Sequence, residues 1–130
     1  MKLLLIIAAI VEAPAGIALL LVPDVVSSLL LNTPIDTPTG LVLARIAGAA
    51  LIALAIACWQ ARDGDRESPA TGVVEAILFY NFAAAMVLVY AGIRLELRSS
   101  VLWPAIVLHL SLGIWCGLNL WLTRRRLSRP

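Results

Sequence analysis

The chain has 130 residues, of which 62% are hydrophobic and only 14% are charged, and its formal net charge at pH 7 is +2. Soluble domains contain about 45–50% apolar and about 25% charged residues. The composition therefore excludes a soluble enzyme, a disordered segment and a disulfide scaffold. Four membrane-spanning helices of about 20 residues each, with short connections, would use the whole length. We therefore expect residues 1–130 to form a single integral membrane domain.

An apolar run predicts the first helix over about residues 3–22. A cleaved signal peptide is the alternative for this segment, because residues 13–15 (Ala-Pro-Ala) resemble a cleavage site. The run continues through Val22 and is long enough to span a membrane, so we expect an uncleaved helix. After the break at Pro23, residues 24–31 are apolar but too short to cross the bilayer. We expect them to form a short interfacial or re-entrant helix on the outer side of the membrane.

Three further spanning helices are predicted, separated by polar turns: residues 40–61, 71–93 and 101–123. Thr37 is placed to cap the first of these helices, with Pro38 at its first helical position. The fold class that follows is all-α. We expect an up-down-up-down four-helix transmembrane bundle with a short helix after the first span.

The distribution of basic residues predicts the orientation of the bundle. The loops on one side hold only Arg94 and Arg98. The opposite side has the amino terminus, the second loop and the carboxyl tail, which together hold Lys2, Arg62, Arg66, Arg124, Arg125, Arg126 and Arg129. This excess predicts that both termini are cytoplasmic. We expect the tail arginines to contact membrane lipid, and we expect no nucleic-acid partner because no soluble segment combines basic and aromatic residues.

Each spanning helix contributes one polar residue that lies well inside the membrane: Glu12, Arg45, Asn81 and His109. An ionisable side chain at such a depth costs roughly 2.5–3.5 kcal/mol and needs a partner or a purpose. Small residues stand three and four positions away from each of the four, as is typical of helix–helix contacts in membranes. The pattern predicts that all four side chains point into the bundle, in the middle and outer half of the membrane.

Two interpretations of this set remain open. In the first, an apolar pocket binds a hydrophobic small-molecule ligand, lipid-like or isoprenoid, and Arg45 and Asn81 contact it. Glu12 and His109 are then candidate catalytic residues for acid/base chemistry of the isomerase or cyclase type. In the second, Glu12 and Arg45 form a buried ion pair that only holds the bundle together. We expect no cofactor and no metal, because one histidine and one intramembrane carboxylate are too few ligands for a metal site.

Two sequence features concern packing and partners. Cys58 and Cys116 lie on different predicted helices and form no CxxC motif, which argues against a thiol oxidoreductase and favours a packing role. Gly113 and Gly117 form a GxxxG motif, which predicts either close packing within the bundle or a homodimer face.

The second predicted span contains the run LARIAGAALIALAIACW, residues 43–59, which resembles the second helix of small bacterial four-helix membrane proteins of the DoxX-like kind. Glu12 in the first helix and the run LLLVPD, residues 19–24, resemble the same group. The resemblance implies a protein of the bacterial inner (cytoplasmic) membrane with a membrane-embedded accessory or quinone-linked role, and it assigns no catalytic residue. In architecture alone the chain is similar to small bacterial membrane cyclases that act on isoprenoid epoxides with a buried carboxylic acid. The alternatives are an accessory subunit of a larger membrane complex and a proton-coupled small exporter that uses Glu12.

Overall fold

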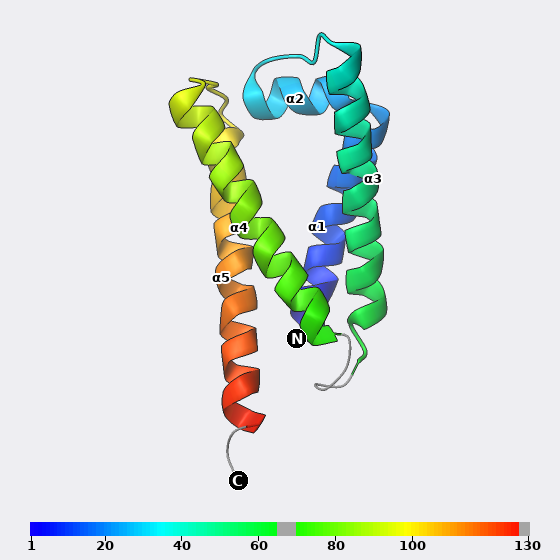
Figure 1. The fold of residues 1–130 in the computed structure, drawn as a ribbon, viewed down its shortest axis with the longest axis vertical. Helices are drawn as coiled ribbons and strands as arrows, with labels where there is room; N and C mark the ends of the chain where they lie inside the picture. Colours follow the sequence, from blue (N-terminus) through cyan, green and yellow to red (C-terminus); the bar gives the residue numbers. More distant parts are fainter. Residues whose placement is uncertain (65–69, 128–130) are drawn as a thin grey trace.

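The computed structural model describes residues 1–64 and 70–127, the last two as backbone only. These ranges contain five helices and no strand: α1 (Lys2–Leu21), α2 (Pro23–Leu31), α3 (Pro38–Ala61), α4 (Ala70–Arg94) and α5 (Leu102–Leu127) (Figure 1). All except α2 are long and apolar enough to cross a membrane. The predicted all-α fold with four spans and a short helix after the first span is therefore confirmed, and the chain has the architecture of a multi-pass membrane protein.

The start of α3 follows from its first residues. The Thr37 side chain accepts a hydrogen bond from the Gly40 backbone N–H at 3.1 Å, and Pro38 occupies the first helical position. The proline has no backbone N–H, so it leaves no donor unsatisfied at the helix start. The predicted cap is confirmed. At the other end of the preceding connection, α2 ends at Leu31 and is followed by Asn32, whose left-handed backbone (φ 56°) turns the chain away from the helix axis.

The spanning helices associate as two pairs, α1 with α3 and α4 with α5, and these pairs make most of the contacts between helices. Figure 1 shows that the two pairs are close together near the amino terminus and diverge toward α2, which lies across the opposite end. There the Ser99 hydroxyl, in the connection before α5, donates a hydrogen bond to the Leu29 carbonyl of α2. The two pairs are therefore linked at both ends of the molecule.

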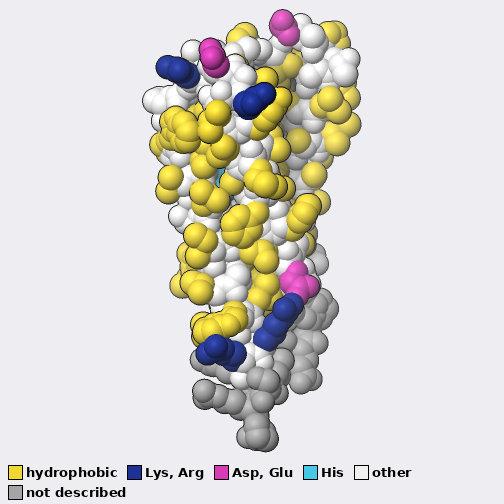
Figure 2. All heavy atoms as spheres, turned by 60° about the vertical axis from the view of Figure 1, so that its left-hand side comes forward, with side chains coloured by type: hydrophobic (Ala, Val, Ile, Leu, Met, Phe, Trp, Pro, Cys, Tyr) yellow, Lys and Arg dark blue, Asp and Glu magenta, His cyan; other side chains and the backbone are white. Residues whose placement is uncertain are grey.

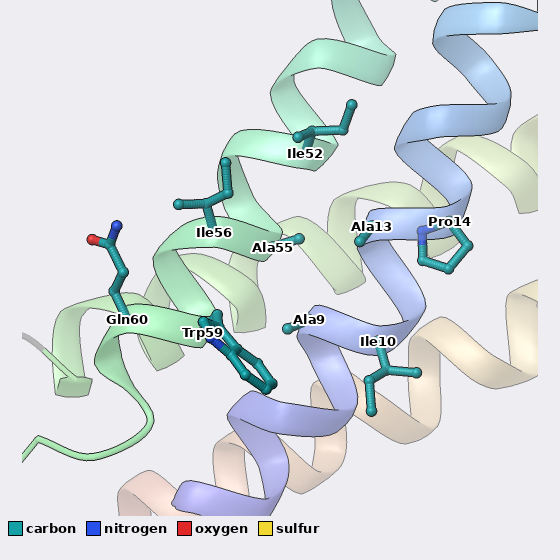
Figure 3. A pocket seen from close by; sticks show the side chains of 9 residues that line it. All are labelled: Ala9, Ile10, Ala13, Pro14, Ile52, Ala55, Ile56, Trp59 and Gln60. Atoms are coloured by element: carbon teal, nitrogen blue, oxygen red, sulfur yellow. The ribbon is translucent and has the colours of Figure 1, made fainter.

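Two glycines allow α1 and α3 to approach closely. A Cβ atom added at Gly16 would lie 2.7 Å from the backbone oxygen of Gly48, and one added at Gly48 would lie 2.7 Å from the oxygen of Gly16. Any side chain at either position would therefore collide with backbone, which cannot move aside as a flexible side chain can. Toward the amino-terminal end of the same pair, a shallow apolar groove runs along the surface between α1 and α3 (Figure 3).

The GxxxG motif of α5 is used inside the chain. Gly113 is buried, and the Phe82 ring of α4 lies so close that a Cβ atom at Gly113 would be 3.2 Å from the nearest ring carbon. A Cβ atom at Gly117 would lie 3.8 Å from the Leu78 side chain of α4. The motif thus supports packing of α5 against α4, while a homodimer stays a prediction.

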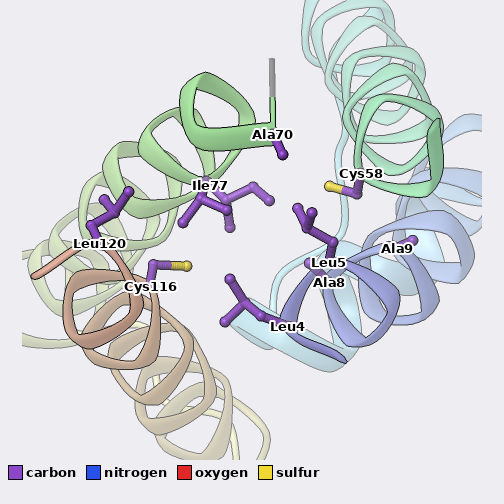
Figure 4. Packing of buried hydrophobic residues seen from close by; sticks show 10 residues of the cluster. Leu4, Leu5, Ala8, Ala9, Cys58, Ala70, Ile77, Cys116 and Leu120 are labelled. Carbon is purple, nitrogen blue, oxygen red and sulfur yellow. The ribbon is translucent and has the colours of Figure 1, made fainter. Parts of the chain in front are cut away.

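Near the amino-terminal end the two pairs share one apolar core, which we call the core cluster. All four spanning helices contribute to it, and Figure 4 shows Leu5, Cys58, Ile77 and Cys116 pointing into the space between the two pairs. Its buried members are Leu4, Leu5, Ala8, Ala9, Cys58, Ala70, Val74, Ile77, Cys116 and Leu120. Both cysteines are free thiols with no exposed surface, so they pack in the core as predicted.

The surface is apolar along the middle of the molecule and charged at its ends. Figure 2 shows this banding on the face formed by α4 and α5. At the amino-terminal end, the carboxylate of Asp63 pairs with Lys2 at 2.7 Å and with Arg62 at 3.2 Å, and Glu75 pairs with Arg124 at 2.9 Å. Such a band fits the hydrocarbon layer of a bilayer with its charged residues at the interfaces. The side of the membrane on which each end lies stays a prediction from the basic residues.

Candidate functional site

Four polar side chains in the middle of the molecule contact one another and form what we call the polar cluster. Glu12 comes from α1, Tyr80 and Asn81 from α4, and His109 from α5. Only 1% of the surface of Glu12 and none of Asn81 is exposed, and His109 is half-buried. The cluster therefore includes a carboxyl group and an imidazole within the apolar band. It draws on both helix pairs.

The carboxyl group of Glu12 is only partly satisfied. The Tyr80 side chain lies within hydrogen-bonding reach of it, across the boundary between the two helix pairs. The Oε1 atom of Glu12 is buried and has no hydrogen-bond partner among the residues that the structure describes. In native proteins the large majority of buried polar atoms have such a partner, so this atom calls for an explanation.

The hydrogen bond between Asn81 and His109 in the cluster has a defined direction. The Asn81 side-chain nitrogen donates to the Ile77 carbonyl at 2.9 Å, one turn back in α4. This places the Asn81 oxygen opposite His109 Nδ1, at a distance of 2.9 Å. Since that oxygen can only accept, Nδ1 must carry the hydrogen. In a neutral imidazole the other nitrogen, Nε2, is then the acceptor.

A ring contact joins these two interactions. The rings of Tyr80 and His109 meet edge to face, with centroids 5.7 Å apart and an interplanar angle of 81°. This arrangement is favourable for aromatic rings and holds the phenol in place beside the carboxyl group of Glu12. The four side chains thus form one continuous series of contacts from α1 through α4 to α5.

Three of the four predicted residues are brought together, and Arg45 is the exception. The prediction that it points into the bundle is wrong, because its side chain is exposed on α3. The described residues contain no ion pair between it and Glu12, so the predicted Glu12–Arg45 pair is also wrong. Residues three and four positions apart lie on the same face of a helix. Gly48, three positions after Arg45, is buried, but Ala49, four positions after it, is exposed, so Arg45 lies at the edge of the buried face.

Tyr80 is the member of the cluster that sequence reasoning missed. It was overlooked because tyrosine is common in membrane proteins at the interfaces, where its hydroxyl group reaches water. Tyr80 is instead the eleventh residue of the 25-residue helix α4, close to its middle. A tyrosine at that depth, directly before a predicted polar residue, is a signal that its hydroxyl group has a partner inside the protein.

The donor set of the cluster is one carboxyl group, one phenol, one amide and one imidazole. Within the part of the chain that the structure describes, no three His, Cys, Asp or Glu side chains come together in a way that could hold a metal ion. The arrangement can form hydrogen bonds to a ligand and can exchange a proton with it through Glu12 or His109.

Comparisons of this chain with protein-family models, with curated proteins and with solved structures found no match. The resemblance to the DoxX-like group therefore stays a prediction that depends on the residues quoted above. The polar cluster has to be interpreted from its own geometry.

Proposed function

We propose that the protein binds an apolar small molecule inside the membrane and that the carboxyl group of Glu12 recognises the one polar group of that molecule. The observation that carries the proposal is the buried Oε1 atom of Glu12, which has no partner among the described residues. The proposal concerns a ligand that reaches Glu12 from the hydrocarbon layer.

The energetic argument starts from the cost of an unsatisfied buried atom. Leaving a buried donor or acceptor without a partner costs about 1–3 kcal/mol. A methionine would fill similar space at this position without that cost, and it would also suit the small-residue surroundings of α1. A carboxyl group that remains there in spite of the cost is explained if a ligand supplies the missing hydrogen bond. This is the reason for assigning the site to binding.

The chemistry of the cluster limits the class of ligand. The apolar band around it favours a hydrocarbon body, such as an isoprenoid or another lipid-like molecule. An ionised carboxyl group accepts a hydrogen bond from a single hydroxyl on that body, whereas a protonated one donates to a single carbonyl or epoxide oxygen. Tyr80 lies within hydrogen-bonding reach of the carboxyl group and orients it, and His109 presents Nε2 as a second acceptor.

Conversion of the ligand is a further part of the proposal. Glu12 can act as the acid that protonates an epoxide, an alkene or a carbonyl, because its surroundings exclude water and hold the group in place. His109 can receive a proton in the same event. This would make the protein an isomerase or cyclase of hydrophobic substrates.

A role as an accessory subunit is the second candidate, and Arg45 favours it. This arginine is exposed eight residues into α3, within a helix that is apolar enough to span a membrane. Charged residues within spans usually face protein, because contact with hydrocarbon is costly. A carboxylate or a carbonyl group on a partner subunit would satisfy it.

The test of the binding proposal is mass spectrometry of the compounds that co-purify with the protein. The double variant Glu12→Met, Tyr80→Phe removes both polar partners and changes the volume little. We expect the bound compound to fall at least tenfold, the effect of losing roughly 1.4 kcal/mol of binding energy. Replacing both partners of a buried hydrogen bond is nearly neutral or stabilising, so the unfolding free energy should stay equal or rise.

Two comparisons make the test decisive. The control is Ser111→Ala, which removes an exposed hydroxyl that bonds only to the Val107 carbonyl of its own helix, and it should retain the compound. Glu12→Gln separates binding from acid chemistry, because the amide keeps the hydrogen bonds but cannot protonate a substrate. A double variant that binds as well as the parent, or that loses several kcal/mol of stability, would show that the carboxyl group is structural.

A further inference from the structure

A second site lies on the outer surface of the α1/α3 pair, away from the polar cluster. It is a groove of about 470 Å³ between the two helices. Small side chains, Ala9, Ala13 and Ala55, form its floor, and Ile10 and Ile56 flank it (Figure 3). Its volume is within the range of about 300–1,000 Å³ that is common for small-molecule sites.

The end of the groove nearest the amino terminus changes from apolar to polar. Trp59 and Gln60, in the last turn of α3, line it there. An indole N–H and a carboxamide can form hydrogen bonds, and tryptophan prefers the level of lipid headgroups. The groove therefore passes from hydrocarbon-like walls to hydrogen-bonding groups along the direction of the membrane normal.

Positive charge follows directly beyond this end. The Arg62 guanidinium stacks on the Trp59 ring at 4.0 Å from its centroid, and it also donates to the Trp59 carbonyl. Lys2 and Arg62 share the single carboxylate of Asp63, at 2.7 Å and 3.2 Å. Among the side chains that the structure describes here, these two cations and one anion leave one positive charge. Arg62 uses Nε in its salt bridge with Asp63 and Nη1 in its hydrogen bond to the Trp59 carbonyl, so the N–H groups of Nη2 have no partner among the described residues.

We propose that this groove is a binding site for an anionic glycerophospholipid of the leaflet that faces the amino terminus. One acyl chain lies in the apolar groove, the ester groups of the glycerol meet Trp59 and Gln60, and the phosphate is bound by Arg62 and Lys2. The order of groups along the protein matches the order of groups in such a lipid. Guanidinium groups bind phosphate through parallel N–H donors, and basic sites between spanning helices recognise anionic headgroups.

Charge complementarity selects this occupant over a second copy of the chain. A second copy would bring another Lys2 and Arg62 close to the same positive end, or would cover that end with apolar surface. A lipid with a net negative headgroup neutralises the charge instead. The lipid site is independent of the ligand proposed for Glu12, because that residue does not line the groove.

The experiment is native mass spectrometry of the full chain in a non-ionic detergent, titrated with phosphatidylglycerol or with phosphatidylcholine of the same acyl chains. We expect one tightly bound phosphatidylglycerol and several-fold weaker binding of phosphatidylcholine. Each basic residue near the headgroup contributes about fivefold in affinity. Arg62→Gln should therefore weaken phosphatidylglycerol about fivefold and leave phosphatidylcholine unchanged. The matched control is Arg98→Gln, an exposed arginine at the opposite end of the molecule.

Two further variants test the charge and the groove separately. Asp63→Asn raises the net charge of the cluster by one and should tighten phosphatidylglycerol, a gain that misfolding cannot produce. Ala13→Leu fills the groove and should weaken both lipids, whereas Ala53→Leu, at an exposed alanine that does not line it, should weaken neither. Equal binding of the two lipids, an unchanged affinity in Arg62→Gln, or dimers in place of lipid adducts would each overturn the proposal.

Discussion

The hydrogen bond between Asn81 and His109 determines which imidazole nitrogen carries the hydrogen. Asn81 uses its nitrogen on the Ile77 carbonyl, so its oxygen faces His109 Nδ1. The neutral ring is therefore held with the hydrogen on Nδ1 and with Nε2 as the acceptor. The hydrogen form and the orientation of the imidazole therefore depend on this one amide.

Replacing Asn81 by leucine should release the ring. We expect the parent protein to show the Nδ1–H form and Asn81→Leu to lose that preference, with a loss of about 0.6–1.7 kcal/mol of stability, the range of such bonds in membranes. Nitrogen-15 NMR measures the form directly, because the chain has one histidine. Asn119→Leu is the control, since Asn119 donates to the Trp115 carbonyl of its own helix. The same imidazole form in Asn81→Leu and in the parent would contradict the assignment.

Asp63 offers a prediction on pH at the edge of the membrane. The hydrogen bond from Lys2 lowers the pKa of the Asp63 carboxyl group below its ordinary value, and the positive charges of Lys2 and Arg62 act in the same direction. A lowered pKa means that the bridge stabilises the protein above the ordinary pKa of aspartate and is lost as the pH falls through the lowered value. Lys2→Gln should therefore raise the pKa of Asp63, measured from the carbon-13 shift of its carboxyl group. A pKa that stays in place would show that the Lys2 contact does not persist in solution.

At the level of single residues, the sequence predicted burial better than partners. Glu12 and Asn81 are buried as their small neighbours indicate. The partner of Glu12 was not predictable, because Tyr80 comes from α4 and the contact depends on how the two helix pairs meet. The prediction that Arg45 points into the bundle failed because small residues occur on the exposed side of α3 as well as on its buried side.

The α1/α3 pair depends on the close approach at Gly16 and Gly48. An alanine at either position places Cβ 2.7 Å from a backbone oxygen of the other helix, so the helices must separate. We expect Gly16→Ala and Gly48→Ala each to lose about 1–3 kcal/mol, the usual cost of overpacking. Unfolding in lipid bilayers measures this loss. Gly72→Ala is the matched control, because a Cβ atom there has nothing within 4 Å among the described residues and should be neutral or stabilising. Equal effects at all three glycines would contradict the close contact.

The helices themselves were predictable, but their pairing was not. The predicted bounds differ little from those observed because Pro23, Pro38 and the charged turns interrupt the apolar runs. Small residues occur on every span, so the sequence offered many packing faces of similar quality. The choice of α1 with α3 depends on two glycines lying at the same level in antiparallel helices, and this is a property of the assembled structure.

The whole molecule consists of two helix pairs that are held together by side chains from all four spans. The core cluster joins the pairs at the amino-terminal end, and the Ser99 contact with α2 joins them at the other. The polar cluster lies between these two attachments, where Glu12 and Tyr80 meet across the boundary. Movement of one pair relative to the other would therefore change the surroundings of Glu12.

If the core cluster holds the pairs together, the connection between them should be dispensable. A protease site placed within residues 65–69 allows the purified protein to be cut between α3 and α4 in detergent. We expect the two fragments to stay associated, since Leu5 and Ile77 pack in the cluster from opposite pairs.

The double variant Leu5→Ala, Ile77→Ala should lose this association, because packing rather than the hydrophobic effect holds helices together in an apolar medium. The exposed pair Ile46→Ala, Ile114→Ala removes comparable volume outside the cluster and should keep it. Recovery of the α4/α5 fragment with a tagged α1/α3 fragment measures the result. If the fragments separate after cleavage of the protein without the alanine substitutions, the connection and not the cluster holds the molecule together.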